Sequence, residues 1–168
     1  MVAAYENSIR DRRLKRIYNL HDFECRARKL LPRALAEYVF GGVEDNVTLA
    51  NNRRQFDDYS LLTSVLRDVS QRHTQHSVLG QVYAAPFGIA PIGVSALIAF
   101  NGDNVLASAA YNLGIPMILS GSSLTRLEEV KQHHPQVWFQ AYLPGQPDLQ
   151  DALIERVAAA GIDTLVIT

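Results

Sequence analysis

A repeated alternation of short apolar runs and helical patterns between residues 84 and 168 constrains the fold of this chain most strongly. Apolar runs occur at residues 87–90, 117–120, 137–142 and 164–168. Between them, apolar residues recur every three or four positions, as in the expected helix 103–112, which stops at Gly114. Strands joined through helical crossovers pair in parallel. The sequence therefore predicts an α/β fold with a parallel sheet.

The loops after these strands distinguish the two parallel architectures that suit the pattern, an open doubly wound sheet and a (β/α)8 barrel. The turn after the first strand, APIGVSALIAFNGD (residues 90–103), has isolated glycines and no glycine-rich phosphate motif. Polar residues end the later strands, and in a barrel those ends build the active site. They are Ser120, Gln140, Tyr142 and Thr168. We predict the first four β/α units of a (β/α)8 TIM barrel.

Residues 1–83 lack the regular alternation of apolar runs and helical patterns found in residues 84–168. Residues 19–39 read as helical, with Asn19 as a cap, and residues 74–86 read as two extended pieces around Leu79 and Gly80, a hairpin. We therefore predict an N-terminal part with helices and a hairpin, residues 1–83, and a partial barrel, residues 84–168, within the same domain.

Composition excludes several classes of protein. With 48% hydrophobic and 20% charged residues, the 168-residue chain is not of the disordered kind, and its net charge of -1 gives no general attraction to nucleic acid. No apolar stretch approaches the ~18 residues of a membrane span. The sole cysteine, Cys25, cannot form an internal disulfide, which favours a cytoplasmic location and leaves peripheral membrane association open. The five histidines show no metal-binding spacing, so we predict no metal site.

The segment WFQAYLPG (residues 138–145) offers the most specific chemistry. Gln140 and Tyr142 are two residues apart in a strand, so they point to one face while Phe139 and Ala141 point to the helices. An amide supplies both a donor and an acceptor, and a phenol can donate to a carboxylate or hydroxyl. Taken alone, the pair is better explained by a strand-capping Gln and a packed Tyr ring.

Five segments resemble, in order and spacing, the amino-terminal half of the FMN-dependent 2-hydroxy acid dehydrogenases and oxidases. They are LLPRALAEYVFGGVEDNVTLANNR, APFGIAPIG, LSGSS, FQAY and LVIT. This family includes glycolate oxidase, flavocytochrome lactate dehydrogenase and mandelate dehydrogenase. The resemblance covers about residues 17–168, and it implies an FMN cofactor.

Matched by position, the resemblance implies roles for nine residues. The predicted cofactor-binding residues are Ala90, Pro91, Ile92, Gly93, Ser120, Gln140 and Thr168. The first four would lie along the flavin ring through their backbone, and the last three would hydrogen-bond its polar edge. Tyr38 would bind the substrate carboxylate, and Tyr142, the predicted catalytic residue, would contact the substrate hydroxyl. Many relatives read Ala-Pro-Thr-Ala where this chain has Ala-Pro-Ile-Gly, so position 92 supplies no hydroxyl.

The resemblance implies FMN-dependent oxidation of an (S)-2-hydroxy acid to the 2-oxo acid. The electron acceptor would be oxygen, a cytochrome or a quinone, and the intact protein would be a homo-oligomer. Thr168 falls at the end of the fourth of eight strands, so we expect an amino-terminal fragment that lacks the family's histidine base and is inactive alone. Two alternatives remain open: a non-catalytic half-barrel that binds or assembles with a partner, and a barrel enzyme that uses FMN or a sugar phosphate for other chemistry.

Overall fold

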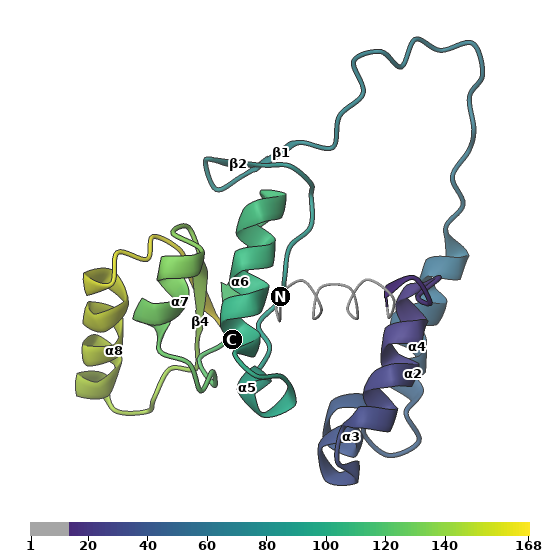
Figure 1. The fold of residues 1–168 in the computed structure, drawn as a ribbon. Coiled ribbons are helices and arrows are strands. Elements are labelled where there is room, and N and C mark those ends of the chain that lie inside the picture. The colour runs from purple at the N-terminus through teal and green to yellow at the C-terminus, as the bar shows by residue number, and fades with distance from the viewer. Residues whose placement is uncertain (1–13) are drawn as a thin grey trace, which may run out of the picture. The chain divides into compact units, whose positions relative to one another are not determined.

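The structure is a computed structural model that describes residues 14–168, and these residues divide between positions 65 and 66 into two compact units (Figure 1). The hairpin belongs to the second unit, together with the parallel strands. The division after residue 83 into two parts of one domain stays a prediction.

The first unit consists of short helices. They are α2 (Leu20–Leu30), α3 (Arg33–Phe40), α4 (Val47–Arg54) and the 3-10 helix η1 (Gln55–Asp58). Asn19 caps α2 as predicted: its side chain accepts from the Asp22 N–H at 3.1 Å, and the Asp22 carboxylate accepts from the Asn19 N–H at 3.2 Å.

The helical stretch expected at residues 19–39 is interrupted, which corrects the sequence prediction. Leu31 is extended, with φ -76° and ψ 141°, and α3 begins after Pro32. A proline ring disfavours helical geometry in the preceding residue, and proline has no N–H to donate to the previous turn. The apolar period of three and four continues through the break, so periodicity alone did not reveal it.

A β-hairpin opens the second unit, as predicted. Strand β1 (His76–Val78) pairs antiparallel with β2 (Gln81–Tyr83), and Leu79 and Gly80 turn the chain with φ of 51° and 80°. Tyr83 is buried, and its hydroxyl accepts from the indole N–H of Trp138 at 3.2 Å. The hairpin thus covers the amino end of the following sheet.

The sheet contains three parallel strands in the order β3 (Ile118–Leu119), β4 (Trp138–Ala141) and β5 (Leu165–Ile167). Residues 87–90, expected as the first strand, contribute a single parallel bridge between Ile89 and Met117. Gly88 lets the two backbones approach closely, because an added Cβ would lie 2.4 Å from the Pro116 carbonyl oxygen, and Pro91 has no N–H with which to continue the pairing. Four complete β/α units therefore stay a prediction.

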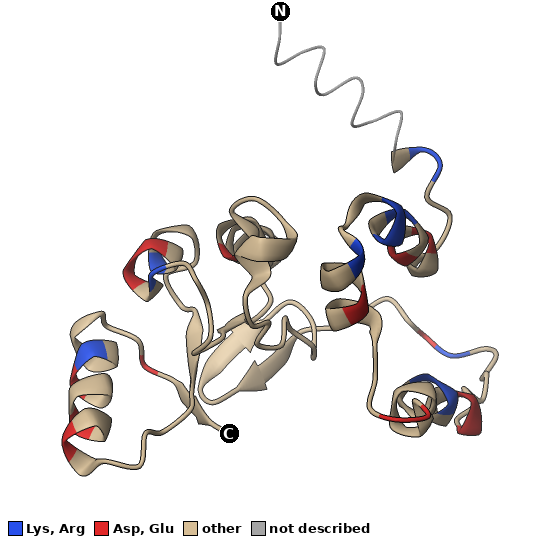
Figure 2. Ribbon diagram, turned by 90° about the horizontal axis from the view of Figure 1, so that it is seen from below, with Lys and Arg blue, Asp and Glu red and all other residues tan. Residues whose placement is uncertain are grey.

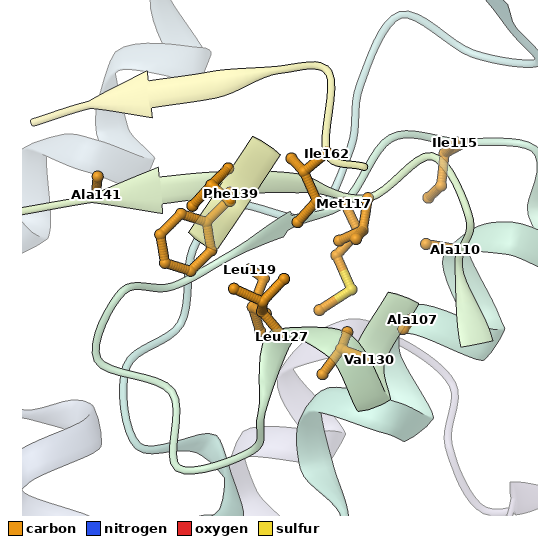
Figure 3. Close-up of a cluster of buried hydrophobic side chains, with 12 residues drawn as sticks. Ala107, Ala110, Ile115, Met117, Leu119, Leu127, Val130, Phe139, Ala141 and Ile162 are labelled. Atoms are coloured by element: carbon orange, nitrogen blue, oxygen red, sulfur yellow. The ribbon is translucent and has the colours of Figure 1, made fainter. Parts of the chain in front are cut away.

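The second unit contains four helices: α5 (Ser95–Ile98) and α6 (Gly102–Leu113) before β3, α7 (Leu127–His133) between β3 and β4, and α8 (Pro147–Ala159) between β4 and β5. Gly114 ends α6 with φ 63°, as expected from the sequence. Side chains of α6 and α7 point toward Met117, Leu119 and Phe139, where they form the buried apolar core (Figure 3). Phe139 and Ala141 face this core, as predicted from strand alternation.

Two polar links join α7 to α8. Lys131 on α7 donates to the carbonyl oxygens of Ala160 and Gly161 at the end of α8, and Arg156 pairs with Glu128 at 2.9 Å. A cation near the C-terminus of a helix is favoured by the helix dipole. Charged side chains lie on helices and loops, whereas the parallel strands carry none (Figure 2). Among residues 14–168, every helix is too short or too polar to cross a bilayer.

Candidate functional site

The amide of Gln140 is the centre of a polar network at the carboxyl end of the sheet. Gln140 lies on β4 with 1% of its surface exposed. Its Oε1 accepts from the Gly121 backbone N–H at 3.1 Å and from the Ser120 hydroxyl at 3.3 Å, and its Nε2 donates to the Thr168 hydroxyl at 2.8 Å. The structure therefore brings together Ser120, Gln140 and Thr168, three of the predicted cofactor-binding residues.

The partners of Gln140 fix which end of its amide faces which neighbour. A backbone N–H can only donate, so the Gly121 contact requires the carbonyl oxygen of the amide on that side. Ser120 Oγ accepts from the Ser122 N–H at 3.1 Å, which leaves the Ser120 hydroxyl proton for Gln140. The NH2 group consequently faces Thr168. Thr168 is exposed and keeps its hydroxyl proton as a donor, whereas the second N–H of Gln140 is buried.

Residues 90–93 run beside the turn that follows β3. An added Cβ on Gly93 would lie 3.5 Å from Ser122 Cβ and 3.9 Å from Ser120 Oγ, and the Val94 N–H donates to the Ser122 carbonyl at 3.2 Å. Ala90 and Ile92 are exposed, and Pro91 is half-buried. The backbone of this segment is thus adjacent to Ser120, and its predicted contact with a flavin ring stays a prediction.

The two tyrosines with predicted substrate roles lie in different units. Tyr142 follows β4, is 59% exposed, and places its ring carbon Cδ2 3.6 Å from the position of an added Cβ on Gly121. It therefore lies at the same end of the sheet as Gln140. Tyr38 lies on α3 in the first unit and is 67% exposed. Its role at the substrate carboxylate stays a prediction.

The amino end of the sheet differs in chemistry from the Gln140 network at the carboxyl end. A cavity of about 300 Å³ is lined mainly by apolar side chains, and none of its lining residues is charged. They include Phe87, Ile89, Ile118 and Trp138. The lining lacks the several convergent polar side chains that orient a ligand in a binding site. Among residues 14–168, no three His, Cys, Asp or Glu side chains gather to hold a metal ion.

The sequence prediction missed the backbone N–H of Gly121 and the residues that hold its turn. Gly121 packs so closely that an added Cβ would lie 2.7 Å from the Gln140 carbonyl oxygen. Ser123 donates to the buried carboxylate of Asp103 at 2.7 Å. The run Ser120-Gly121-Ser122-Ser123 after a strand was the available signal, because serine and glycine are typical of side-chain-supported turns.

Comparison with known proteins adds a family match. The model of the FMN-dependent dehydrogenase family matches residues 27–168. The putative L-lactate dehydrogenase of Mycobacterium tuberculosis is 38% identical over 159 residues, which cover 94% of this chain and 38% of that protein. The L-lactate oxidase of Lysinibacillus sphaericus is 31% identical and is matched over 88% of this chain and 39% of its own length.

A solved structure shares the fold. A soluble mutant of the membrane-associated (S)-mandelate dehydrogenase from Pseudomonas putida superposes with a TM-score of 0.84 at 32% identity, covering 90% of this chain and 43% of that one. The chain spans about two fifths of the length of the curated relatives that it matches, and corresponds to their amino-terminal portion.

Proposed function

Because this chain belongs to the FMN-dependent dehydrogenase family, we propose that it is the amino-terminal part of an enzyme that oxidises an (S)-2-hydroxy acid to the 2-oxo acid. FMN is the cofactor of the family, and when bound it would supply the hydride acceptor for oxidation of the substrate's C2–H bond. We further propose a TIM barrel for the complete protein, a cytoplasmic location, a homo-oligomeric state, and oxygen, a cytochrome or a quinone as the acceptor. The isolated chain would be inactive.

The residues present fit the polar edge of a flavin. The pyrimidine end of an isoalloxazine alternates carbonyl and N–H groups, and it requires paired donors and acceptors from the protein. Gln140 and Thr168 present donors side by side, and their positions are held by further hydrogen bonds. Gly93 adds no side chain where a flat ring would lie against the backbone. This pre-set polarity of the Gln140 amide is the observation that supports the proposal most directly.

The roles proposed for this chain's own residues follow from their chemistry. Ser120, Gln140 and Thr168 bind and orient the cofactor edge, and donors aimed there stabilise the negative charge that develops on reduction. Tyr142 is the catalytic residue and contacts the substrate hydroxyl, and Tyr38 binds the carboxylate. Phenol hydroxyls can serve both tasks as hydrogen-bond donors.

A non-catalytic half-barrel is the second candidate. The apolar cavity and the 61% exposure of Ile167 on the outer strand β5 favour it, because an exposed strand edge is a pairing surface. A partner that covers this face would give an assembly module with no need for FMN.

The two candidates are separated by a chimera in which residues 1–168 are joined to the part of the Pseudomonas putida (S)-mandelate dehydrogenase that follows the matched region. We expect the chimera to purify with visible flavin absorbance, and an (S)-2-hydroxy acid to bleach it in stopped flow. A folded chimera that cannot be reconstituted with FMN would exclude the enzyme and leave the assembly module.

A further inference from the structure

The buried carboxylate of Asp103 stands outside the roles assigned so far. Asp103 lies in the first turn of α6 with 1% of its surface exposed. Its Oδ2 accepts a hydrogen bond from Ser123 Oγ at 2.7 Å, which reaches across to the turn between β3 and α7. An acidic residue in the first turn of a helix is favoured by the dipole, but that alone does not require burial.

The turn that Asp103 contacts is closed by its own serines. The Ser123 N–H donates to the Ser120 carbonyl at 3.0 Å, and the Thr125 N–H donates to Ser123 Oγ at 3.0 Å. Because Ser123 has one hydroxyl proton, the shorter contact with Asp103 takes it in preference to the Thr125 carbonyl at 3.1 Å. Ser123 thus connects α6 to the backbone on both sides of the turn.

The same turn sets the orientation of the Gln140 amide. Its Gly121 N–H and Ser120 hydroxyl hold the Oε1 atom, and this leaves the NH2 group facing Thr168. A turn that drifted away would remove the donors that distinguish one end of the amide from the other, and the amide could rotate by 180°. Rotation would exchange a donor for an acceptor at the edge of the site.

We propose that Asp103 is a positioning residue that, through Ser123 and the 120–125 turn, fixes the donor and acceptor ends of the Gln140 amide. The statement about the amide holds for this chain by itself. Its consequence for cofactor affinity rests on the proposed function. A second contact holds α6 in place against α7, because Asn104 Nδ2 donates to Glu129 Oε1 on α7 at 2.5 Å.

The test uses the full 168-residue chain with 15N label and no cofactor. Ser123→Ala and Asp103→Ala remove the same hydrogen bond from opposite sides. Ser108→Ala is the matched control, because Ser108 lies on the same helix and contacts His133. The readouts are the nuclear Overhauser contact between the Gln140 NH2 protons and Thr168, and the exchange rates of those protons and of the Gly121 amide proton.

We expect both variants to weaken the Gln140–Thr168 contact and to speed exchange by roughly 10-fold, the factor that corresponds to ~1.4 kcal/mol. Ser108→Ala leaves both readouts unchanged. If Asp103→Ala fails to fold, Ser123→Ala decides alone. Unchanged Gln140 signals in Ser123→Ala, with only a lower melting temperature, would overturn the proposal and leave Asp103 a structural residue. Since no flavin is present, a failure of FMN binding elsewhere does not affect this result.

Discussion

The two units of this chain differ in the interactions that stabilise each of them internally. Residues 66–168 bury a continuous apolar cluster of 12 side chains (Figure 3), whereas Ala36 is the single buried residue among residues 14–65. In the first unit, apolar side chains such as Leu20 and Leu30 are more than 80% exposed.

Local contacts take the place of a core in the first unit. They comprise the Asn19–Asp22 capping box, the Glu24–Arg28 pair at 2.9 Å, and the Arg28 guanidinium 4.2 Å above the Phe40 ring. Each such contact contributes about 1 kcal/mol or less at an exposed site. The second unit can therefore hold a site rigidly through its own core, whereas the first unit depends on helix caps and ion pairs.

Truncating a core side chain should give the largest difference between the units. Leu119 is 1% exposed and Leu30 is 81% exposed. We expect Leu119→Ala to lower the free energy of unfolding by about 2–5 kcal/mol and Leu30→Ala to change it by less than ~0.5 kcal/mol. Urea unfolding followed by fluorescence of Trp138, the sole tryptophan, measures the second unit, and helical circular dichroism along the same titration measures the first. Equal losses for both variants would show that the contrast in burial does not govern stability.

Adding a methyl group at the turn beside Gln140 should have the next largest effect. A Cβ on Gly121 would lie 2.7 Å from the Gln140 carbonyl oxygen, whereas one on Gly145 meets no described atom within 4 Å. We expect Gly121→Ala to destabilise the second unit by ~1–3 kcal/mol, the usual cost of overpacking. Gly145→Ala should leave stability unchanged or raise it slightly. The same urea titration measures both, and a neutral Gly121→Ala would mean that the turn is loose.

Removing the cap of α2 should destabilise the first unit and leave the second unit unaffected. Asn19→Ala should cost the first unit about 1 kcal/mol, because the capping hydrogen bond to the Asp22 N–H is lost. Helical circular dichroism should decrease while the Trp138 transition stays in place. Asn52→Ala, the same change inside α4, should not reduce helicity. A shift of the Trp138 transition would show that the two units unfold as one.

Lowering the pH should weaken the Glu128–Arg156 pair between α7 and α8, with a smaller effect on stability than loss of the α2 cap. Hydrogen bonds from Arg156 lower the pKa of Glu128 to about 2, below its ordinary value of 4.5. A depressed pKa in the folded state contributes stability above pH 4.5, and that contribution is lost as the pH falls toward 2. Glu128→Gln should therefore flatten the dependence of the urea midpoint on pH in this window. Glu155→Gln, an exposed change on α8, is the control, and an equal flattening would contradict the assignment.

The sequence allowed local features of both units to be predicted. The Asn19 cap, the Leu79–Gly80 turn, the Gly114 stop and the alternation that turns Phe139 and Ala141 toward the helices each depend on a few neighbouring residues, and the structure contains all four. The break at Pro32 was missed because the apolar period continues through it. The restriction that Pro32 places on the backbone of Leu31 outweighed the helical periodicity of the apolar residues.

The candidate site could be predicted in part. Ser120, Gln140 and Thr168 were found because polar residues at successive strand ends converge in a parallel sheet, and the structure brings them together. The Asp103–Ser123 bond joins residues 20 positions apart. No local pattern specifies such a contact, because it depends on how α6 and the turn pack. A backbone donor such as the Gly121 N–H cannot be predicted from residue type, because every residue except proline carries one.

FMN affinity in the chimera described above measures whether the Gln140 edge of the second unit binds FMN. Gln140→Leu keeps the volume and removes the amide, and Gln150→Leu makes the same change on α8, where Nε2 donates to the Pro144 carbonyl at 2.7 Å. Loss of one or two hydrogen bonds of ~1 kcal/mol each predicts a Kd for FMN that rises roughly 10-fold in Gln140→Leu. The Kd should stay unchanged in Gln150→Leu. Equal affinities for the wild type and Gln140→Leu would contradict the claim.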